Sequence, residues 1–69
     1  MLTKTQIKAI KAEVDDTNLH PLIDELGKNG WVMVQSLSDA EWIQGQCPEG
    51  TSIVYDGTVS GPYWRLEIG

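Results

Sequence analysis

The chain contains one cysteine and one histidine among its 69 residues, which limits how a fold of this size can be stabilised. Cys47 alone cannot close an internal disulfide, and Cys47 with His20 supplies too few ligands for a closed tetrahedral zinc site. A domain this short buries only about 60% of its unfolded surface, so it depends on close packing or on a partner chain. The sequence therefore predicts one small domain, residues 1–69, held by helix–sheet packing or by self-association.

The first predicted element is an amphipathic helix. Thr3 and Gln6 have the spacing of a capping box, in which each side chain satisfies a backbone N–H of the other residue. Ile7, Ile10 and Val14 then follow at spacings of three and four, which places them on one face of a helix.

A second helix is predicted after the residues DDTN, which favour helix caps. Its apolar positions follow the helical repeat without a miss: Leu19, Leu22, Ile23 and Leu26. Pro21 suits the first turn, where a missing N–H costs little, and either Gly27 or Gly30 ends the helix in a left-handed conformation.

Residues 31–37, WVMVQSL, are predicted to form a strand that is buried on both faces or nearly so. Ser38 and Glu41 repeat the capping-box spacing, which predicts a short helix over residues 39–44. The following GQCPEG is rich in turn residues and is predicted to be a connection.

Two strands are predicted at the end of the chain, over residues 51–55 and 63–68. The dipeptide at 56–57, Asp-Gly, favours a tight hairpin that pairs the first strand with residues 58–61. The Gly-Pro at 61–62 competes as the bend, with 57–62 as a longer loop.

The predicted fold is therefore α+β, in the order α-α-β-α-β-β, with a small antiparallel sheet covered on one face by the two N-terminal helices. Along the last strand, Trp64, Leu66 and Ile68 alternate with residues of the opposite face. We expect Trp31 and Trp64 to lie in the core.

The net charge of −5 argues against binding to nucleic acid, which depends on neutralising phosphates with Lys and Arg. Lys4, Lys8 and Lys11 form a stripe on the first helix that we interpret as a solvated face. No apolar run approaches the length of a membrane span. A free cysteine without a secretory leader indicates a cytoplasmic protein.

The sequence offers little to a catalyst. Glu49 lies close to Cys47, and a neighbouring acid opposes the low pKa that a reactive thiol requires. His20 before Pro21 is typical of a residue that makes a hydrogen bond at a helix entry. Because no phosphate-binding, dinucleotide-binding or metal-binding motif is present, we expect a non-enzyme without cofactor or metal.

The aromatic residues suggest a binding surface instead. A sheet covered on one face cannot bury all of them, and Trp, Tyr and Arg dominate binding hot spots. The predicted partner-binding patch has a centre of Trp42, Tyr55, Tyr63 and Arg65. Its acidic rim is formed by Asp39, Glu41, Asp56 and Glu67.

An aromatic patch with an acidic rim suits a protein partner with a basic surface. Our first hypothesis is an inhibitor or anti-activator that occupies a partner's functional surface, by analogy with compact acidic proteins of phages and mobile elements. The alternative is a self-associating structural or assembly subunit, such as a homodimer. A Cys47-dependent enzyme is the third hypothesis.

Overall fold

The computed structural model describes residues 2–57 and 63–69 and has the predicted α+β architecture. Its elements, in chain order, are α1 (Lys4–Glu13), the 3-10 turn η1 (Thr17–Leu19), α2 (His20–Asn29), β1 (Trp31–Val34), α3 (Leu37–Gln46), β2 (Ser52–Asp56) and β3 (Tyr63–Glu67). With η1 counted as the first turn of the second helix, the predicted order α-α-β-α-β-β is confirmed.

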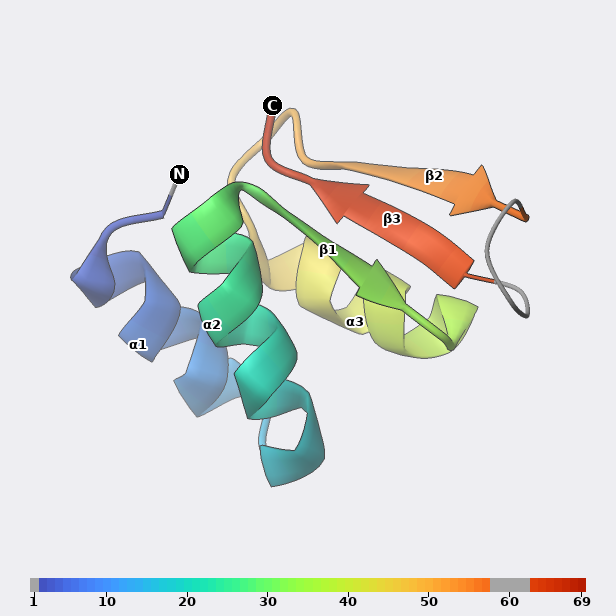
Figure 1. The fold of residues 1–69 in the computed structure, drawn as a ribbon. Coiled ribbons are helices and arrows are strands. Elements are labelled where there is room, and N and C mark those ends of the chain that lie inside the picture. Colours follow the sequence, from blue (N-terminus) through green and yellow to red (C-terminus); the bar gives the residue numbers. More distant parts are fainter. Residues whose placement is uncertain (1, 58–62) are drawn as a thin grey trace.

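The three strands form one antiparallel sheet in the order β1-β3-β2, so the last strand of the chain lies in the middle. All three helices lie on the same side of this sheet (Figure 1). Helix α2 packs on β1, α3 packs on all three strands, and α1 packs against α2 and α3. The predicted cover by the N-terminal helices is thus completed by α3, which packs on β2 and β3.

The sequence signals at the start of α1 and at the end of α2 operate as predicted. Thr3 and Gln6 form both hydrogen bonds of the capping box. Gly30 ends α2 with φ 83°, a left-handed conformation that a residue with a Cβ rarely adopts. Gly27 lies inside the helix, where a Cβ would clash with the Cδ1 atom of Ile7, so it permits close approach of α1.

Helix α3 begins earlier than predicted. Its N-cap is Ser36, whose side chain accepts a hydrogen bond from the backbone N–H of Asp39 at 3.4 Å. The Ser38 capping box is therefore wrong: Ser38 lies within the first turn, and its hydroxyl is 3.0 Å from that of Ser36. Two serines with the same capping preference stand two residues apart, and the first one was overlooked.

The core lies between the sheet and the helices and is formed by side chains from every element except β2. Its fully buried members with the largest volumes are Ile23, Leu26, Ile43, Leu66, Val14, Val32 and Val34. Trp64 and Ile68, predicted on the same face as Leu66, pack against this core while partly exposed. Trp64, which was predicted to be a core residue, therefore lies at the edge of the core.

Strand β1 is not buried on both faces, and this prediction is wrong. Val32 and Val34 are 2% exposed, whereas Trp31 is 46% exposed and Met33 is partly exposed. Because successive side chains of a strand point to opposite faces, Trp31 cannot share the core with Val32. The unbroken apolar run WVMV concealed this alternation.

The tight hairpin predicted at Asp56-Gly57 does not set the strand pairing. Strand β2 pairs with β3, from Asp56 opposite Tyr63 to Ser52 opposite Glu67. This register agrees with the alternative in which 57–62 connect the strands. The arm predicted over 58–61 lies outside the described residues.

Candidate protein-binding surfaces

The register of the sheet separates the predicted aromatic patch into two groups. Tyr55 lies opposite Trp64 and therefore projects toward the helix side of the sheet. Tyr63 and Arg65 occupy alternate positions to Trp64, so they project to the other side. The predicted centre thus does not form a single surface.

The uncovered side of the sheet brings together a different set of residues, which we call the open face. We restrict the name to Trp31, Met33, Val54, Tyr63, Arg65 and Glu67, although Ser52 and Asp56 project to the same side. Trp31 and Val54 are 46% and 41% exposed, and the other four are partly exposed. None of the described helices lies over this face (Figure 1).

Two interactions between side chains order the polar part of the open face. The Nε atom of Arg65 is removed from solvent and lies 2.5 Å from a carboxylate oxygen of Glu67, although not at a hydrogen-bonding angle. The side-chain amide of Gln35 donates to the Tyr63 hydroxyl at 2.9 Å. The Arg65–Glu67 ion pair leaves the centre of the open face close to neutral, flanked by apolar side chains.

The other members of the predicted patch lie on the helix side. Tyr55 is 63% exposed at the edge of the sheet, and its ring packs edge-to-face on Trp64 with centroids 5.7 Å apart. Trp42, Asp39 and Glu41 all belong to α3, and Trp42 is 37% exposed. Asp56 and Glu67, the rest of the predicted acidic rim, do not lie on the helix side: they belong to β2 and β3 and project to the uncovered side of the sheet.

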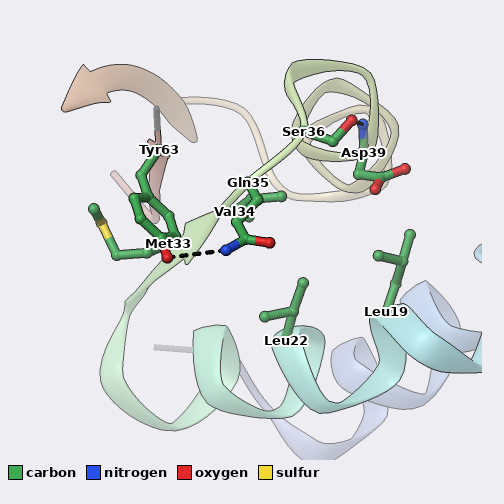
Figure 2. Close-up of a pocket in the computed structure, with 8 residues that line it drawn as sticks. All are labelled: Leu19, Leu22, Met33, Val34, Gln35, Ser36, Asp39 and Tyr63. Atoms are coloured by element: carbon green, nitrogen blue, oxygen red, sulfur yellow. Dashed lines mark hydrogen bonds between the residues drawn. The ribbon is translucent and has the colours of Figure 1, made fainter. Parts of the chain in front are cut away.

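A groove of about 460 Å³ lies beside the C-terminal end of β1 and the connection to α3, and it meets the open face at Met33 and Tyr63 (Figure 2). Its apolar lining comes from Leu19, Leu22, Met33 and Val34, and its polar lining from Gln35, Ser36, Asp39 and Tyr63. Leu19 and Leu22 project into it from η1 and α2, below the strand as drawn (Figure 2). Asp39 has no ion-pair partner among the described residues.

Cys47 and His20 do not form a reactive pair in this fold. Cys47 lies in a separate cavity of about 340 Å³, with Gln6, Ala9, Ile10, Gln46 and Pro48 as the other lining residues. Burial raises the pKa of the Cys47 thiol above its ordinary value, which disfavours the nucleophilic thiolate. The Nε2 atom of His20 donates to the carbonyl oxygen of Val14, the C-cap residue of α1, at 2.7 Å. The side chain therefore bridges the turn between the helices and does not make the predicted cap hydrogen bond at the entry of α2.

The acidic residues do not converge on a metal. Within residues 2–57 and 63–69, no group of three or more His, Cys, Asp or Glu side chains has an arrangement suited to an ion. One lysine of the α1 stripe is paired, because Lys11 Nζ lies 2.6 Å from the Asp24 carboxylate on α2. Lys4 and Lys8 are exposed, as expected for a solvated face.

No helix in the described part of the chain has the length and apolar character needed to cross a membrane. Comparison of the chain with models of protein families, with curated proteins and with solved structures finds no match in any of the three. The geometry of the surface is therefore the basis for inferring function.

Sequence reasoning missed three members of the open face: Trp31, Met33 and Val54. The signal was the position at which the strand begins. Since Gly30 ends α2, the strand starts at Trp31, and strict alternation with Val32 and Val34 would have placed Trp31 and Met33 outward. By the same alternation, Val54 projects to the open face because its neighbours Ile53 and Tyr55 project to the helix side.

Proposed function

We propose that this chain is a non-catalytic protein that acts by binding another protein, as an inhibitor or anti-activator that occupies a functional surface of its partner. The observation that carries the proposal is the open face, where Trp31 and Val54 stay exposed on the side of the sheet that none of the described helices covers. Apolar side chains grouped on an exposed face are typical of interaction sites, whereas single exposed ones are ordinary. The open face also contains a tryptophan, a tyrosine and an arginine, the residue types that dominate binding hot spots.

The partner that fits this surface is a protein with an apolar contact patch and basic surroundings. The chain carries −5 overall, so its long-range field favours a basic surface during encounter. The paired Arg65 and Glu67 contribute no net charge at the centre, which suits close apolar contact there. The raised pKa of Cys47 supports the non-catalytic part of the proposal. A reducing compartment such as the cytoplasm suits the free thiol.

Self-association is a second candidate, favoured by one specific observation. Both outer strands of the sheet, β1 and β2, have one edge that is not paired to another described strand. A second copy of the chain could pair with either edge or pack on the open face, which would enlarge a core that is small for an independent domain. Size-exclusion chromatography with light scattering measures this: a monomer at all concentrations contradicts the second candidate.

Affinity capture from a lysate of the source organism tests the first candidate. We expect the wild-type chain to retain a partner and Trp31→Ala to lose it, because this substitution removes the largest ring of the open face. Trp42→Ala is the matched control, since it deletes an equally large and similarly exposed ring from α3.

Thermal unfolding of both variants checks that each remains folded. Retention of the partner by Trp31→Ala together with its loss in Trp42→Ala would move the contact to α3, where Asp39 and Glu41 supply the predicted acidic rim. Equal capture by both variants and the wild-type chain would contradict the proposal for either surface.

A further inference from the structure

We infer that the free edge of β1 and the adjoining groove bind an extended, apolar peptide segment that carries a basic residue. This inference rests on the proposed function and specifies how part of the partner binds. Three features of the structure support it: the direction of the β1 backbone groups, the apolar wall beside them and the unpaired carboxylate in the groove.

The hydrogen-bond register identifies the free backbone groups of β1. Ile68 donates its backbone N–H to the Gly30 carbonyl at 2.9 Å, so this pair belongs to the hydrogen-bonded class of an antiparallel ladder. The classes alternate along the ladder, and Val32 and Val34 therefore bond to β3. The N–H and C=O groups of Trp31 and Met33 point away from β3, toward the free edge.

Among the devices that prevent strand addition, the described part of the chain gives the edge of β1 only a short length, four residues. Natural edges are protected by lysine, proline, a bulge or a covering segment, whereas β1 reads WVMV and has regular pairing. Its short length limits the addition to a short segment. An added strand gains main-chain hydrogen bonds from the edge and specificity from pockets for its alternate side chains.

The groove provides such a pocket at the C-terminal end of the same edge, beside Met33 and Val34. Leu19 and Leu22 form an apolar wall on the helix side, and Met33 and Tyr63 border the groove on the side of the open face (Figure 2). A strand placed along β1 would direct every second side chain against Leu19 and Leu22. Apolar side chains at those positions match this wall.

Asp39 determines the charge of the preferred segment. Its carboxylate lines the groove and has no cationic partner among the described residues. A lysine or arginine of the incoming segment would complete an ion pair there, and the net charge of −5 acts in the same direction. The groove thus favours a basic apolar segment over an acidic one.

The probe for the test is a short blocked peptide of alternating valine and threonine with a lysine at each end. We titrate it into ¹⁵N-labelled protein and follow the backbone amide resonances. Saturable shifts at Trp31, Met33 and Leu22 are expected. Two control peptides replace both lysines by glutamate or carry N-methyl groups on alternate amides, and each is expected to bind at least tenfold more weakly.

Three variants separate the contributions of the free backbone edge and of the Asp39 carboxylate to peptide binding. Met33→Pro removes a donor of the free edge without removing a bond to β3, and it is expected to abolish binding of the peptide. Tyr55→Pro is the matched control on β2, because the same alternation directs the backbone of Tyr55 to the other free edge; it is expected to change the affinity by less than about twofold. Asp39→Asn is expected to remove the preference for lysine over glutamate.

Equal binding of the N-methylated peptide would overturn the inference, and so would shifts centred on Val54 and Tyr55. Concentration-dependent shifts at Met33 without peptide would identify a second copy as the occupant and overturn it as well. Failure of the inference is distinguishable from failure of the proposed function. A partner captured by Met33→Pro but lost by Trp31→Ala would leave the open face as the contact and exclude the edge of β1.

Discussion

The two faces of the sheet share the same strands but serve different purposes. On the helix side, Val32, Val34 and Leu66 are at most 2% exposed and lie within a continuous core. On the open face, Trp31 precedes Val32 in β1 and Val54 lies in the neighbouring part of the sheet, in β2, yet each exposes more than two fifths of its surface. One face has its apolar side chains covered by helices, and the other keeps them in contact with solvent.

The side chains on the helix side stabilise the fold, whereas those on the open face are available for contact. Burial of apolar area stabilises the domain only where a second layer excludes water. An apolar residue on the open face stabilises the isolated chain little and would stabilise a complex more. The comparison predicts large losses of stability on the helix side and small losses on the open face.

The largest expected effect is that of Leu66→Ala. Leu66 is fully buried in the central strand, and its truncation is expected to lower the free energy of unfolding by about 2–5 kcal/mol. Val54→Ala, which trims an exposed side chain in the neighbouring strand, is expected to cost less than about 1 kcal/mol. Urea denaturation measures both values. Equal losses would abolish the distinction between the faces.

The alkylation rate of the Cys47 thiol tests whether packing on the helix side shields it from solvent. Since burial raises the pKa of its thiol, alkylation by iodoacetamide at neutral pH is expected to be on the order of tenfold slower in the folded chain than in urea. The folded chain holds this proton more tightly than the unfolded chain. Stability is therefore expected to fall as the pH rises through the pKa of the folded state. Alkylation at equal rates in both states would contradict burial of the thiol.

Tyr55→Leu tests a contact at the border of the two faces. The ring of Tyr55 packs edge-to-face on Trp64 while remaining largely exposed, so its replacement is expected to cost about 1 kcal/mol. The double-mutant cycle with Trp64→Leu measures the pair directly. A coupling energy indistinguishable from zero would show that the aromatic contact contributes nothing.

The smallest expected effect is that of Tyr63→Phe on the open face. It removes the hydroxyl that accepts from Gln35 at 2.9 Å, an exposed hydrogen bond expected to contribute about 0.5 kcal/mol. Chemical denaturation with the wild-type chain measured in parallel resolves this difference. A loss above about 2 kcal/mol would mean that the open face is needed for folding.

Much of the fold could be predicted from the sequence because its signals are local. The capping box of Thr3, the helical repeat from Leu19 to Leu26 and the left-handed Gly30 each act within a few residues. The composition of the open face depends on register between distant strands instead. Trp31 was wrongly placed in the core because WVMV contains no polar residue to reveal the alternation.

The predicted patch failed as one surface for the same reason. Tyr55 and Tyr63 are both aromatic and both near the hairpin, but their faces follow from the pairing of Asp56 with Tyr63. That pairing depends on how many residues connect the two strands, and the Asp-Gly signal at 56–57 favoured too short a connection. The predicted patch joined Trp42, Asp39 and Glu41 to the tyrosines because of their residue types alone, and not because of any sequence signal for spatial proximity.

The most direct test of the open face as a contact surface is site-specific photo-crosslinking in cells of the source organism. A benzoylphenylalanine at Val54 projects from the open face, and the same residue at Glu41 projects from α3 as the matched control. The proposal predicts a discrete crosslinked protein band from position 54 and none from position 41. A band from position 41 alone, or none from either position in cells where the chain is functional, would contradict it.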